Sequence, residues 1–134
     1  LHAPTDDIRE MIMPINKKFK IKDLIKECKY YSSVVKEKIT LEYVMLRDVN
    51  DSTECAKQLV KLMAQFPCKV NLIEFNPWPG VQYLPTERVE MEKFGKIIQD
   101  SGYVATIRRS RGQDILGACG QLKTESQKIN INKQ

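Results

Sequence analysis

The stretch Ile39–Leu46 reads Ile-Thr-Leu-Glu-Tyr-Val-Met-Leu, an apolar, β-branched and aromatic run that predicts a buried strand. Asn50-Asp51-Ser52 ends this run, and either Asp51 or Ser52 can cap a following helix. That helix is expected to face the core with five side chains: Cys55, Leu59, Leu62, Met63 and Phe66. Val70–Phe75, with Cys68 at its start, predicts a second strand.

The same alternation continues on both sides of this unit. Downstream, Thr86 can cap a helix that Gly102 ends in a left-handed conformation, and Tyr103–Arg108 predicts a third strand. The inward side chains of this helix are expected to be Met91, Phe94, Ile97 and Ile98. Strands that alternate with helices over short connections predict βαβ units, a parallel sheet and an α/β fold.

The first 35 residues predict two further helical segments. Thr5 is placed to cap the first, in which Ile8, Met11 and Ile12 fall on one face. The second keeps helical spacing over Ile21, Leu24, Ile25, Cys28 and Tyr31. This spacing predicts that Cys28 is a core residue. Cys55 is expected to be one too, because it belongs to the apolar face of the helix that follows Ser52.

Composition restricts the class of protein. The chain has 134 residues, 42% of them hydrophobic, which suffices for one core, and we find no internal repeat and no domain boundary. Its four cysteines lack paired spacing, and no segment is typical of a signal peptide or a membrane span, so we expect an intracellular, cytoplasmic protein. A net charge of +5 and a pI near 9.0 fit an RNA partner or a solvated lysine-rich face equally.

The chain's last 30 residues contain a candidate reactive thiol. Cys119 lies between Ala118 and Gly120, downstream of Arg108, Arg109 and Arg111. Positive charge lowers the pKa of a thiol and small neighbours leave its sulfur accessible, which favours a nucleophile. A small cysteine buried in a tight turn is the other interpretation.

Three motifs in order resemble one enzyme family. They are Leu1–Arg9 with Met13–Phe19 (similar to S-L-H-A-P-N-D-x-x-R…P-I-N-K-K-Y), Phe75–Gly80 (N-P-F/W-P-G), and Arg109–Leu122 (R-x-R-G-x-D-I-x-x-A-C-G-Q-L). Together they resemble the RlmN/Cfr family of radical S-adenosylmethionine (SAM) RNA methyltransferases. The resemblance implies the C-terminal half of a partial radical-SAM (β/α) barrel with parallel strands over residues 1–122, followed by a polar, disordered tail over residues 123–134.

The resemblance also implies site residues and cofactors. Leu1, His2 and Asn76 would contact SAM, and Cys119 would be the catalytic methyl carrier. The family's C-x-x-x-C-x-x-C motif for a [4Fe–4S] cluster does not occur here, so we expect the cluster ligands outside this chain and no metal ligand within it. From the residues alone, His2 could equally be an inert residue at a helix entry, and Asn76 a turn-former before Pro77.

The implied reaction is methylation of carbon 2 of adenine in 23S ribosomal RNA, with transfer RNA as a further candidate substrate. Arg111-Gly112 favours this RlmN-type specificity over the Cfr-type alternative, methylation of carbon 8. A non-catalytic RNA-binding module is the alternative from another class. A C-terminal fragment without the cluster region is expected to be inactive by itself.

Overall fold

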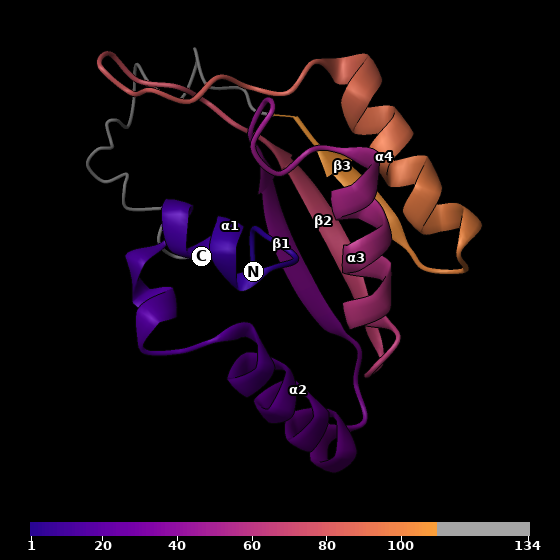
Figure 1. Ribbon diagram of the computed structural model, residues 1–134. Helices are drawn as coiled ribbons and strands as arrows, with labels where there is room; N and C mark the ends of the chain where they lie inside the picture. Colours follow the sequence, from indigo (N-terminus) through magenta and orange to yellow (C-terminus); the bar gives the residue numbers. More distant parts are fainter. Residues whose placement is uncertain (110–134) are drawn as a thin grey trace, which may run out of the picture.

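The computed structural model describes residues 1–109 (Figure 1). Three helices and three strands follow two short N-terminal elements. In chain order the elements are α1 (Asp6–Ile12), the 3-10 turn η1 (Pro14–Lys17), α2 (Ile21–Val35), β1 (Ile39–Met45), α3 (Thr53–Met63), β2 (Cys68–Glu74), α4 (Arg88–Asp100) and β3 (Ala105–Arg108). The predicted alternation is confirmed. Residues 110–134, including Cys119 and the expected tail, lie outside the described part of the chain.

The three strands form one parallel sheet in the order β1-β2-β3. The register pairs Ile39 with Cys68 at one end and Met45 with Glu74 at the other, and Val70 pairs with Ala105. All the carboxyl ends therefore meet at one end of the sheet, where βα loops place ligand-binding residues in folds of this kind. β1 is an edge strand within residues 1–109.

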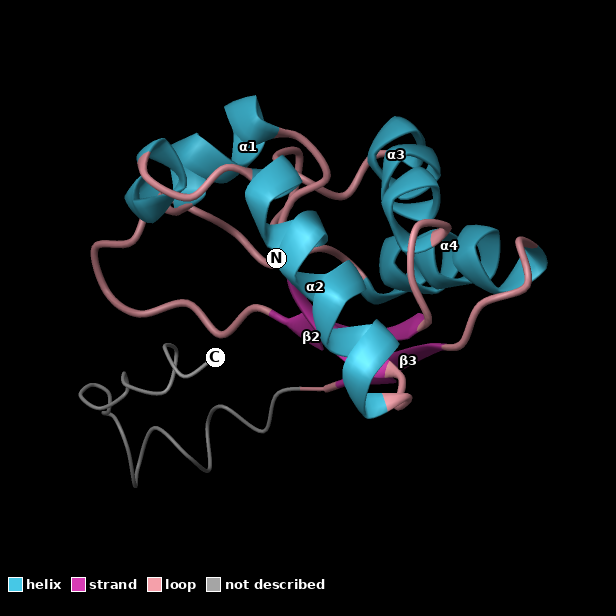
Figure 2. Cartoon of the chain, turned by 90° about the horizontal axis from the view of Figure 1, so that it is seen from below, coloured by secondary structure: helices cyan, strands magenta, loops and turns pink. Residues whose placement is uncertain are grey.

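The core lies between the sheet and the helices that cover one of its faces (Figure 2). Alternate strand residues, such as Leu41, Tyr43 and Met45 on β1, are buried, while the residues between them are exposed or half-buried. This period of two is what a sheet covered on one face requires. The Tyr43 and Phe94 rings meet in the core with centroids 5.4 Å apart, which joins β1 to α4.

Local signals placed most helix ends correctly. Thr5 Oγ1 accepts a hydrogen bond from the Ile8 amide, and Ser52 Oγ accepts one from the Cys55 amide at 3.0 Å. Gly102 has φ of 97°, as expected of a left-handed residue after α4. Cys28 and Cys55 are buried in the core as predicted.

One predicted role is wrong. Thr86 does not cap α4, because its hydroxyl donates to Asp51 Oδ2 at 2.7 Å and the capping position is Glu87. Met11 and Tyr31 keep helical spacing but are exposed, since the core reaches only part of the face on which each lies. At Thr86 a tertiary contact overrode the local sequence preference for a helix cap.

Candidate functional site

His2 lies beside the edge of β1 that β2 does not pair. The Val44 amide donates to His2 Nδ1 at 2.9 Å, and His2 has φ of 61°, in the left-handed region. Because Nδ1 accepts this bond, a neutral ring carries its proton on Nε2. Burial, reinforced by the positive charge of Arg9, lowers the pKa of His2 well below its usual range. The ring is therefore a neutral Nε2–H donor at physiological pH.

Leu1 is fixed from two sides. Its nitrogen lies 3.4 Å from the Glu42 carbonyl oxygen at the same edge of β1, and its carbonyl accepts from Arg9 Nε at 3.2 Å. Arg9 is buried, and its Nη1 donates to Asn16 Oδ1 and to the Phe19 carbonyl, each at 2.7 Å. The guanidinium thus ties the first residues of the chain to η1 and to the residues just after it.

Asn50 is fully buried beside His2. Its Nδ2 donates to the His2 carbonyl at 2.9 Å and to the Val44 carbonyl at 2.8 Å, while its Oδ1 accepts from the Leu46 amide at 2.8 Å. The Tyr43 hydroxyl donates to the Asn50 carbonyl at 2.7 Å. The sequence predicted this position only as a strand breaker, and the available signal was the Asn-Asp-Ser break itself.

Asn76 lies two residues beyond the end of β2, in the loop that leads to α4. It is half-buried, and within residues 1–109 its side-chain amide makes no hydrogen bond. An asparagine that merely starts a turn usually bonds the backbone of that turn. An amide without a hydrogen-bond partner among residues 1–109 therefore fits a group that donates to or accepts from a ligand.

The sheet brings His2 and Asn76 to the same end of the molecule. His2 is bonded to Val44, which pairs with Ile73, and Asn76 follows three residues after Ile73. The loop around Asn76 is further held by an edge-to-face contact of Phe75 with Trp78, whose ring centroids are 5.7 Å apart. Two of the three predicted SAM contacts thus share the carboxyl end of the sheet, and Leu1 adjoins His2.

Cys119 lies outside the described residues, as do Ser110 to Gly120 on either side of it. Arg108 ends β3 at the carboxyl end of the sheet.

The three cysteines of residues 1–109 do not form a metal site. Cys28, Cys55 and Cys68 are free and buried, and burial raises the pKa of Cys68 to about 11. Within the same range no three His, Cys, Asp or Glu side chains group as metal ligands. These thiols are core residues, and an iron–sulfur cluster would need ligands from elsewhere.

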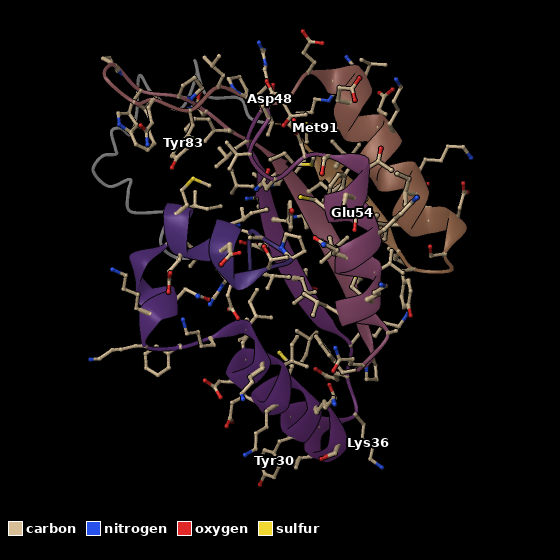
Figure 3. All side chains as sticks on the ribbon, in the orientation of Figure 1. Tyr30, Lys36, Asp48, Glu54, Tyr83 and Met91 are labelled. Carbon is tan, nitrogen blue, oxygen red and sulfur yellow. The ribbon has the colours of Figure 1, made fainter. Side chains whose placement is uncertain are left out.

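A separate cleft of about 810 Å³ opens between α1, the loop after β1, and the start of α3 and α4. Asp48 and Glu54 lie on this side of the molecule (Figure 3). The carboxylates that line the cleft outnumber its positive charge, which comes from Arg47. These carboxylates belong to Asp7, Asp48, Asp51, Glu54, Glu87 and Glu90. Their charge repels phosphates, so this cleft does not suit an RNA backbone.

No helix described in residues 1–109 is long and apolar enough to cross a membrane.

Comparison with known proteins yields relatives of one kind. No family model matches the chain. It is 54% identical over 130 residues to the dual-specificity RNA methyltransferase RlmN of Agrobacterium fabrum, covering 96% of the chain and 32% of the relative. The RlmN of Brucella anthropi is 52% identical over 135 residues, with 100% and 33% covered. The chain thus spans about a third of the length of the curated relatives it matches.

Solved structures agree with this result. A radical SAM methyltransferase from Sphaerobacter thermophilus is 38% identical with a TM-score of 0.82, covering 86% of this chain and 34% of that one. A domain of pyruvate-formate lyase-activating enzyme from Bacteroides vulgatus is 14% identical with a TM-score of 0.62, covering 81% and 63%, and shares the fold alone. The resemblance to RlmN-type enzymes is confirmed, and so is an open, parallel α/β sheet that corresponds to part of a radical SAM fold.

Proposed function

We propose that the protein containing this chain is a radical SAM RNA methyltransferase of the RlmN type, acting on carbon 2 of adenine in 23S ribosomal RNA and in transfer RNA. The observation that carries this proposal is an identity of 52–54% to RlmN enzymes over nearly the whole chain. Arg111-Gly112 supports carbon 2 rather than carbon 8. An RNA substrate and a cytoplasmic location follow from the proposal.

Leu1, His2 and Asn76 would hold SAM. The neutral His2 ring offers an Nε2–H donor, and the Asn76 amide offers a donor and an acceptor without charge, which suits the polar groups of a nucleoside or an amino acid. SAM and a [4Fe–4S] cluster would supply the methyl group and the radical chemistry. The cluster ligands would come from outside this chain, and Cys119 would carry the methyl group on its sulfur.

The complete protein, reconstituted anaerobically with iron and sulfide, is expected to methylate an adenine-containing fragment of 23S RNA at carbon 2. Residues 1–134 expressed alone are expected to bind no stoichiometric cluster and to transfer no methyl group, because they lack the three-cysteine motif. Ultraviolet-visible absorbance reports the cluster, and mass spectrometry of nuclease-digested RNA locates the methyl group.

The product identifies the correct alternative. A methyl group on carbon 8 would assign Cfr-type specificity. RNA binding by the complete protein without methyl transfer would support the non-catalytic module, and a cluster with methyl transfer by residues 1–134 alone would refute the fragment interpretation.

Replacing Asn76 with alanine in the complete protein is expected to weaken SAM binding by about 1–3 kcal/mol, the usual cost when a buried polar partner loses its hydrogen bond. Calorimetric titration measures the affinity, and thermal melts measure stability. Gln82→Ala removes an exposed amide from the same loop and is the matched control, with unchanged affinity expected. Unchanged SAM affinity with a large loss of stability in Asn76→Ala would make Asn76 a turn-former only.

A further inference from the structure

Val44 presents its backbone amide and carbonyl at the edge of β1 opposite β2, and no strand of residues 1–109 lies along that edge. The backbone N–H and C=O groups at the edge of a sheet need hydrogen-bond partners. Here side chains supply them: the His2 ring accepts from the Val44 amide at 2.9 Å, and the Asn50 amide donates to the Val44 carbonyl at 2.8 Å. One strand residue therefore connects the imidazole to a buried asparagine.

Asn50 also holds the backbone of His2. Its second amide hydrogen reaches the His2 carbonyl at 2.9 Å, across 48 positions of sequence. His2 has φ of 61°, in the left-handed region. Residues other than glycine adopt this backbone conformation at a cost in free energy and keep it only where surrounding contacts hold it. The Asn50 amide holds the carbonyl of His2 from a buried position, and the Val44 amide holds its ring.

Asparagine satisfies all three contacts at once. Nδ2 uses two hydrogens on two carbonyl oxygens, and Oδ1 accepts from the Leu46 amide. An aspartate of the same shape keeps the acceptor but loses both donors, and it sets a carboxylate against two carbonyl oxygens. A serine is too short to reach three partners on two segments.

We propose that Asn50 is a positioning residue of the SAM site. By donating to the backbone carbonyls of both His2 and Val44, it holds the backbone of His2 in the left-handed conformation. In this conformation Nδ1 accepts from the Val44 amide, and Nε2–H is directed to the ligand. This inference rests on the proposed function, because it takes His2 as a SAM contact. It adds a residue outside the predicted contact set, placed on the loop after β1 and acting through His2 without touching the ligand.

A loop-folding role for Asn50 makes a different prediction. The same loop is tied from its other side by Thr86 Oγ1, which donates to Asp51 Oδ2 at 2.7 Å, and Thr86 makes no hydrogen bond to His2. Thr86→Val therefore loosens the loop while leaving the His2 contacts in place. It is the matched control for Asn50→Asp.

The test measures SAM affinity in the reconstituted complete protein, at a temperature where circular dichroism shows every variant to be folded. Asn50→Asp is expected to weaken SAM binding by about tenfold, as the loss of one buried hydrogen bond would. In a His2→Ala background the same change is expected to alter the affinity by less than about twofold, because coupled residues are not additive. Thr86→Val is expected to lower the melting temperature and leave the affinity within about twofold.

A second readout, the tautomer of the His2 ring, needs no ligand. Nitrogen-15 NMR distinguishes an imidazole protonated at Nε2 from one protonated at Nδ1, and the His2 signal is the one missing from His2→Ala. The wild-type protein is expected to show a single neutral Nε2–H tautomer, and Asn50→Asp a mixture of tautomers.

An Nδ1–H tautomer in the wild type would overturn the proposal. So would wild-type affinity in Asn50→Asp, an equal loss of affinity in Thr86→Val, or an undiminished effect of Asn50→Asp in the His2→Ala background. If His2→Ala itself leaves SAM affinity unchanged, the His2 assignment under the proposed function fails, and Asn50 then positions no SAM contact even where the tautomer is as expected.

Discussion

Replacing Cys119 with alanine in the complete protein is expected to abolish methylation of RNA and to leave the cluster absorbance unchanged. The alanine side chain has no sulfur to carry a methyl group, and none of the cysteines in residues 1–109 can replace it, because Cys28, Cys55 and Cys68 are buried in the core. Mass spectrometry of the active wild-type enzyme should find an added methyl group on the peptide that contains Cys119.

Cys28→Ala is the matched control. It removes a buried thiol from α2, and full activity is expected below its melting temperature. Retained methylation in Cys119→Ala would show that this cysteine has a structural role, and the assignment of the methyl carrier would be withdrawn.

Replacing Phe94 with alanine is expected to destabilise the protein by about 3–5 kcal/mol, the cost of a large cavity in a packed core. Phe94 is 2% exposed, and its ring lies against Tyr43, with centroids 5.4 Å apart. Tyr43 in turn donates its hydroxyl hydrogen to the Asn50 carbonyl at 2.7 Å. Denaturant unfolding followed by circular dichroism measures the change.

Val89→Ala provides the comparison on the same helix. Val89 is 52% exposed, so its truncation is expected to change the free energy of unfolding by no more than about 0.5 kcal/mol. Equal effects of the two substitutions would mean that α4 does not pack on the sheet as described.

The local elements could be read from the sequence because each depends on neighbours a few positions away. The Ile39–Leu46 run gave β1 within a residue, Ser52 caps α3, and Gly102 adopts its left-handed conformation after α4. Alternation of strands and helices also predicted the parallel sheet, since short βα connections leave few other arrangements.

The position of Asn76 was also predictable, because a polar residue directly after a strand lies at the carboxyl end of a parallel sheet. That its amide makes no hydrogen bond within residues 1–109 required the structure. Thr86 shows the opposite case: its pattern predicts a helix cap, but Asp51, 35 positions away, takes its hydroxyl.

By itself, the sequence determined the order of the elements, the burial of Cys28 and Cys55, and the motifs that mark His2, Asn76 and Cys119. Only the tertiary structure decided how His2 is held: the Val44 amide reaches it across 42 positions and Asn50 across 48. Hydrogen bonds over such separations leave no periodic trace in the chain, because they form only once folding has brought the loop after β1 against the first residues.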